Sequence, residues 1–145
     1  MLRLLMKFFI NKESLFELMT YTVKSEKKIE NIIDKVEGLC AEYNLALLHK
    51  YVYHEVVKEK GFPIERKVYI YEVCQAKVAA LVLTDEPDFA PFMPCRIAVY
   101  EKKNNSVIST QNMGMLLDTL KQNEELYLQT NTLFETLKSL MNRLK

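Results

Sequence analysis

The sequence predicts an α+β protein, a two-layer sandwich of a small four- to five-stranded sheet packed with helices, plus a long C-terminal helix. Three observations predict this class. Short runs of β-favouring residues alternate with helical patterns, two central apolar runs alternate with period two, and segment 113–145 has a helical pattern throughout. At 145 residues, we expect residues 1–145 to form a single domain.

The first half of the chain is predicted as strand, helix, strand and short helix. Ser25 is the expected cap of the first long helix, whose apolar residues from Ile29 to Tyr43 recur at steps of three and four. Gly61 and Pro63 end the short helix. The expected ranges are strand 19–24, helix 25–43, strand 45–53 and helix 55–60.

The second half is predicted as strand, helix, hairpin and long helix. Three of the four prolines fall within 85–94, which must therefore be a loop. Leu133, Leu137, Leu140 and Leu144 form a seam that packs either across the sheet or against another subunit. The expected ranges are strand 67–74, helix 75–84, strand 95–101, strand 106–109 and a helix, with room for a break, over 113–145.

An apolar N-terminal extension, residues 1–17, precedes this core. Its first ten residues imitate a signal peptide, but Lys7 interrupts the apolar run and no small-residue cleavage site follows. The run is too short to span a bilayer, so no transmembrane segment is expected. We expect a short helix docked on the domain or on a partner subunit. Surface attachment to a membrane is the alternative, with little electrostatic help from Arg3, Lys7 and Lys12.

Composition excludes several classes of function. A net charge of +1 argues against nucleic-acid binding. Three scattered glycines exclude Gly-rich phosphate loops, and His49 and His54 lack the spacing of a helical zinc site. Three cysteines without a C-x-x-C pair indicate reduced thiols in a cytoplasmic protein rather than disulfides or a zinc ribbon. We therefore expect neither a metal nor a cofactor.

Alternation along the strands predicts two different sheet faces. We expect the helices to cover one of them, formed by Val68, Ile70, Cys74, Cys95, Ile97 and Val99. The opposite face would be rich in tyrosine, which suits interfaces and pockets. Either the C-terminal helix covers this face, or it is a homodimer interface, or it is a ligand pocket. Its expected members are Tyr69, Tyr71, Val73, Arg96, Ala98 and Tyr100, with His49, Tyr51 and Tyr53 from the preceding strand.

Cys74 ends one predicted strand and Cys95 begins another. The two thiols would meet at one sheet edge only if these strands are antiparallel, and Arg96 would then lower a thiol pKa. The simpler interpretation treats both as small apolar core residues. Cys40, inside the apolar stripe of the first long helix, is expected to be buried.

Three segments carry a family resemblance. They are Val68-Tyr-Ile-Tyr-Glu-Val-Cys74, Asp85-Glu-Pro87 and Phe92-Met-Pro-Cys-Arg-Ile-Ala-Val-Tyr-Glu101. Over about residues 18–112 the chain resembles the domain-of-unknown-function 302 family. The resemblance implies a small α+β domain that forms a homodimer, and no known reaction. Relatives continue Cys-Asn-Pro where this chain has Cys74, Gln75 and Ala76, and the extension and C-terminal helix look like additions to the family core.

The sequence favours a cytosolic, non-catalytic homodimeric module that binds a small ligand or a protein partner. Its candidate ligand-binding residues are Cys74, Cys95, Arg96, Tyr69, Tyr71 and Tyr100, and no catalytic residue or metal ligand is expected. A thiol-dependent enzyme or redox sensor using Cys74 and Cys95 is the alternative. A third hypothesis is an assembly module whose terminal helices contact partners.

Overall fold

The computed structural model describes residues 11–145. The strands are β1 (Thr20–Ser25), β2 (Ala46–Val52), β3 (Val68–Cys74), β4 (Cys95–Lys102) and β5 (Asn105–Gln111). The α-helices are α2 (Lys12–Met19), α3 (Ile29–Glu42), α4 (Tyr53–Glu59), α5 (Ala76–Asp85), α6 (Gly114–Leu117) and α7 (Glu124–Leu144). Two short 3-10 helices are η1 (Pro87–Phe92) and η2 (Asp118–Leu120).

The five strands form one antiparallel sheet in the order β1-β5-β4-β3-β2. A tight turn joins β4 to β5, and Lys103 in this turn adopts a positive φ of 57°. The antiparallel pairing of β3 with β4 sets Val73 opposite Cys95, so the last residues of β3 lie beside the first residues of β4 at one end of the strands.

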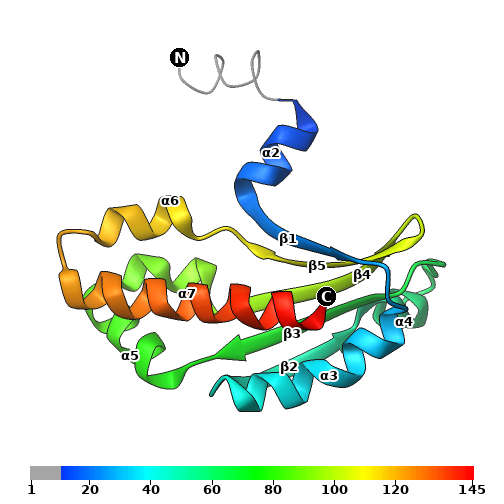
Figure 1. Ribbon diagram of the computed structural model, residues 1–145, viewed down its shortest axis with the longest axis horizontal. Coiled ribbons are helices and arrows are strands. Elements are labelled where there is room, and N and C mark those ends of the chain that lie inside the picture. The colour runs from blue at the N-terminus through cyan, green and yellow to red at the C-terminus, as the bar shows by residue number, and fades with distance from the viewer. Residues whose placement is uncertain (1–10) are drawn as a thin grey trace.

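Helices α3 and α7 lie side by side against one face of this sheet and make it a two-layer structure (Figure 1). Apolar residues of α3 recur every three or four positions, which places Ile29, Ile32 and Val36 in the core. The leucine seam of α7 packs into the same core, where Leu137 and Leu140 are at most 1% exposed. Each fully buried leucine contributes about 1.5–3 kcal/mol relative to an exposed one.

The predicted α+β class and the order of its elements are confirmed, and most boundaries fall within a few residues of the expected ones. One cap is wrong. Ser25 is the last residue of β1, and α3 begins only after Lys28. The Ser25 hydroxyl instead accepts a hydrogen bond from the Lys27 backbone N–H, at 3.2 Å, in the connection between strand and helix.

The predicted assignment of the sheet faces is wrong for β3. Tyr71 and Val73 face the helices, because they pair with Ile97 and Cys95, and both are 1% exposed. The tyrosine-rich side of β3 is thus part of the core, covered by α3 and α7. Of the three alternatives for the tyrosine-rich face, coverage by the C-terminal helix is therefore the one that applies to Tyr69, Tyr71 and Val73.

The other side of the sheet, here called the open face, carries no long helix in the described part of the chain (Figure 1). Among the positions that the cross-strand register places on it are Thr22, Lys24, His49, Tyr51, Val68, Ile70, Glu72, Arg96, Ala98, Tyr100, Lys102, Val107 and Ser109. Val107 and Ser109 are buried among their neighbours, whereas the other positions are half-buried or exposed. Within this surface, Arg96 Nε lies 3.6 Å from Glu72 Oε1.

Helix α2 projects away from the rest of the domain and buries none of its side chains (Figure 1). The part of the predicted N-terminal helix over residues 1–10 lies outside the described residues. Residues 12–19 do form a helix. Of the two expected arrangements, docking on its own domain does not apply to this helix. No helix within residues 11–145 has the length and apolarity needed to cross a membrane.

Candidate functional site

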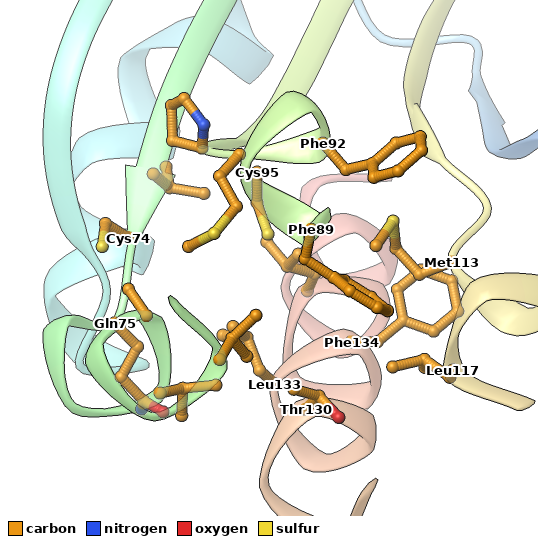
Figure 2. A pocket seen from close by; sticks show the side chains of 17 residues that line it. Cys74, Gln75, Phe89, Phe92, Cys95, Met113, Leu117, Thr130, Leu133 and Phe134 are labelled. Carbon is orange, nitrogen blue, oxygen red and sulfur yellow. The ribbon is translucent and has the colours of Figure 1, made fainter. Parts of the chain in front are cut away.

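A partly open apolar cavity lies at the end of the sheet where β3 stops and β4 starts, here called the sheet-end cavity (Figure 2). Its volume is about 70 Å³. It lies where the main core meets a second apolar cluster, formed by α5, η1, α6, η2 and α7. Val73, Cys95 and Leu137 line it from the main core, while Val78, Phe89 and Phe134 line it from the second cluster.

Helix α5 and η1 form one wall because the local sequence directs apolar side chains inward. Val78 and Val82, one helical turn apart, are the buried residues of α5. Pro87 starts η1, where its fixed φ suits the first helical position. Phe89 is the buried residue of η1, and its ring lies 6.2 Å from that of Phe92 in an edge-on arrangement.

Helix α7 forms the opposite wall. Its N-cap is Asn123, whose side-chain oxygen accepts from the Leu126 N–H at 3.1 Å. From this start, Thr130, Phe134 and Leu137 come to the cavity at helical spacing. Figure 2 shows Leu133 and Phe134 projecting from α7 toward Phe89, with Met113 on the side nearest α6.

The cavity offers almost no polar anchor. Thr130 lines it, but the Thr130 hydroxyl donates its hydrogen to the Leu126 carbonyl at 2.6 Å. Gln75 lies at the rim, just before α5. Among residues 11–145 there is no cluster of three His, Cys, Asp or Glu side chains able to hold a metal ion. A guest would therefore be recognised by shape and apolar contact rather than by charge.

The structure brings Cys74 and Cys95 to this one cavity. In Figure 2 Cys95 directs its sulfur into the interior, whereas Cys74 lies at the edge with its sulfur turned outward. Burial is the main cause that raises the pKa of the Cys95 thiol, and the neighbouring Cys74 adds to it. Arg96 lowers this pKa, as the sequence suggested, but its effect is smaller than that of burial.

The other four candidate residues do not join that cavity. Arg96 and Tyr100 lie on the open face, where burial raises the Tyr100 pKa and the nearby Arg66 lowers it. Tyr69 and Tyr71 lie under the helices, with the Lys50 ammonium 5.7 Å from each ring centroid. Burial raises the Tyr71 pKa, and within residues 11–145 the buried Tyr71 hydroxyl has no hydrogen-bond partner.

Sequence reasoning missed most of the cavity lining. Phe89, Phe92 and Met93 lie in the proline-rich segment that was predicted to be a plain loop, yet all three line the cavity. Large apolar residues in a connecting segment are an available signal, because loops normally expose polar side chains. Met113 gave no such signal, since only the fold brings it to this place.

The model for the domain of unknown function DUF302 matches residues 21–144. The chain belongs to the DUF302 family. The DUF302 match runs past residue 112, where the sequence resemblance stopped, and takes in α7; helix α2 lies outside it.

A solved DUF302 structure has the same fold. It is the crystal structure of an uncharacterized conserved protein DUF302 from Bacillus stearothermophilus, with a TM-score of 0.76 and 23% sequence identity. The alignment covers 88% of this chain and 99% of the other. No curated protein matches the sequence.

Proposed function

We propose that this protein is a cytosolic, non-catalytic binding module that works as a homodimer and takes a small apolar group into the sheet-end cavity. The observation that carries the proposal is the cavity itself, which remains between two packed clusters although protein interiors are normally filled to high density. Three free cysteines agree with a reducing compartment.

The size and lining of the cavity limit the ligand. With about 70 Å³, it has roughly half the volume of an engineered apolar cavity of about 150 Å³ that binds benzene. It is partly open, so a short alkyl end can enter while the remainder of a ligand stays at the rim near Gln75. Flexible Met93 and Met113 side chains in the wall can adapt to the guest.

The open face supports the homodimer. Tyr51, Val68, Ile70 and Tyr100 lie on it half-buried, as expected of apolar residues that a second layer would cover. Sedimentation equilibrium tests this part: a dimer is expected, and a monomer across the accessible concentration range would remove the homodimer from the proposal.

Ligand binding is tested separately by titrating pentan-1-ol into the folded protein and following the thermal unfolding midpoint. Binding to the native state raises the midpoint, and the rise grows with the logarithm of the free alcohol concentration once this exceeds the dissociation constant. Pentane-1,5-diol, of the same length but with two polar ends, is the matched ligand control and should give no rise in the midpoint. If the diol stabilises equally, or if neither compound does, the cavity is not an apolar binding site.

The two cysteines in one cavity also raise the alternative of a thiol-dependent enzyme or redox sensor. Such a function needs a thiolate, and the raised pKa of Cys95 keeps this thiol protonated at neutral pH. We therefore expect iodoacetamide to modify native Cys95 much more slowly than Cys95 in the urea-unfolded chain. Equal rates in the two states, read by peptide mass spectrometry, would favour the thiol function instead.

A further inference from the structure

Helix α2 presents an apolar surface that the rest of residues 11–145 leaves uncovered. Leu15, Phe16, Leu18 and Met19 are 41%, 59%, 41% and 54% exposed, and their positions fall on one side of the helix. Glu13 and Glu17 occupy the opposite side and are also exposed. An amphipathic helix with this division is built to pack against an apolar surface.

That surface cannot be the sheet of the same molecule. Thr20 directly follows Met19 and already pairs with Gln111, so no loop separates α2 from β1. The last turn of α2 is further held by Asn112, whose backbone N–H donates to the Met19 carbonyl at 2.8 Å and whose side chain donates to the Leu18 carbonyl at 3.1 Å. A reversal over the sheet would need a connection of several residues, which is lacking here.

The open face is the matching surface. Its centre is apolar at Ile70, Ala98 and Tyr100, and no long helix of the described chain covers it (Figure 1). Its lysines and arginine, at Lys24, Arg96 and Lys102, outnumber the carboxylate of Glu72. The described helix α2 carries Lys12 with Glu13 and Glu17, so the helix and the open face attract one another at long range.

We propose that two copies of the chain exchange their α2 helices, each helix laying its apolar side on the open face of the other copy. This inference rests on the homodimer of the proposed function and specifies its interface. A two-fold dimer makes the same contact twice, which suits one helix and one sheet face per chain.

The available area is sufficient. A large apolar side chain has a surface of roughly 200 Å². The exposed fractions of the four apolar side chains therefore correspond to on the order of 400 Å² of exposed apolar surface on each α2. Two helices and the two sheet surfaces that they cover then bury about 1,600 Å² in total, which is the size of a standard stable interface. A membrane surface is a poorer partner, because the polar side of α2 is acidic whereas membrane-surface helices carry lysine and arginine there.

Two variants and their mixture test this exchange. Phe16→Glu places a charge on the apolar side of α2, and Ala98→Glu places one at the centre of the open face. In sedimentation equilibrium, each should raise the dimer dissociation constant by about a hundredfold or more, as is common when an interface centre is disrupted. Glu17→Gln, on the opposite side of α2, is the matched control and should remain dimeric.

Mixing the two variants gives the decisive result. In an exchanged dimer, the intact α2 of Ala98→Glu meets the intact open face of Phe16→Glu, so the mixture should form a heterodimer that neither variant forms alone. Far-ultraviolet circular dichroism and urea unfolding identify the folded variants. If Ala98→Glu does not fold, Thr22→Glu, which changes an exposed open-face residue on β1, takes its place.

Each other outcome overturns the exchange. Dimeric Phe16→Glu indicates pairing of sheet with sheet, and a dimeric open-face variant indicates pairing of α2 with α2. Monomeric wild type removes the homodimer itself, whereas dimeric wild type with a dimeric Phe16→Glu removes only the exchange. Co-sedimentation of monomeric wild type, but not Phe16→Glu, with phosphatidylcholine–phosphatidylglycerol vesicles would assign α2 to a membrane surface.

Discussion

Placing a larger apolar side chain in the wall of the sheet-end cavity tests whether this cavity can accept an apolar group. Ala79 lies on α5 and lines the cavity, so Ala79→Leu adds three carbon atoms to its wall. At about 0.8 kcal/mol per buried carbon, the largest gain in the free energy of unfolding is about 2 kcal/mol. For a domain of this size, that gain corresponds to a rise of roughly 4–8 °C in the unfolding midpoint.

Ala80→Leu is the matched control, because this neighbouring alanine on the same helix is exposed and the change alters the free energy of unfolding by less than about 0.5 kcal/mol. Urea unfolding of both variants is the assay. If the region were already closely packed, the added carbons of Ala79→Leu would cost about 1–3 kcal/mol through overpacking. A loss of that size at Ala79, with an unchanged Ala80→Leu variant, would refute the presence of a cavity that can accept a group.

Other expected effects concern the core, the backbone and the thiols. Leu140→Ala should lower the free energy of unfolding by about 2–5 kcal/mol in urea titrations, since Leu140 has no exposed surface. Gly38→Ala, in an exposed interior position of α3 with open space around it, should stabilise by about 0.5–1 kcal/mol, whereas Gly61→Ala should destabilise by about 1 kcal/mol because Gly61 has a φ of 88°. Burial raises the pKa of Cys40 and Cys95, so the folded chain keeps protons that the unfolded chain releases. The contribution of these two thiols to the free energy of unfolding is therefore fully present below the ordinary thiol pKa of about 8.5, and it declines as the pH rises above that value. Urea midpoints from neutral to alkaline pH should show this decline, and replacing both residues by alanine should reduce it.

The order of helices and strands could be predicted because local periodicity carries it. The steps of three and four from Ile29 to Cys40 and the leucine seam of α7 mark amphipathic helices, and both appear where expected. Period two likewise identified which residues of β3 share a side. Such local signals do not depend on how the strands are arranged in the sheet.

Which side of β3 the helices cover could not be read in the same way. Val68 and Ile70 look more like core residues than Tyr69 and Tyr71 do, yet the tyrosines face the helices because they pair with Val99 and Ile97 of β4. Within residues 11–145 the buried Tyr71 hydroxyl has no hydrogen-bond partner, and burial of the aromatic ring is the favourable contribution set against that cost. Only the register between strands distant in sequence decides this question.

The candidate site was predictable only in part. Cys74 and Cys95 could be placed at adjoining strand ends, conditional on antiparallel pairing, and they do line one cavity. The rest of the wall comes from η1, α6 and α7, whose convergence no sequence spacing records. The sequence favoured tyrosine and arginine as ligand-binding residues because they combine a large side chain with a polar group. The cavity is instead apolar, and Phe89 and Phe134 form part of its wall.

The most direct test of apolar ligand binding is a titration of methionine-methyl-labelled protein with pentan-1-ol, followed by two-dimensional NMR. Met93 and Met113 line the cavity, whereas Met115 is 67% exposed and Met141 is fully buried in the main core. We expect saturable shifts of the Met93 and Met113 methyl resonances, little change at the other two, and loss of the effect in Ala79→Leu. Shifts that are linear in alcohol concentration and equal at Met93 and Met115 would contradict ligand binding in the sheet-end cavity.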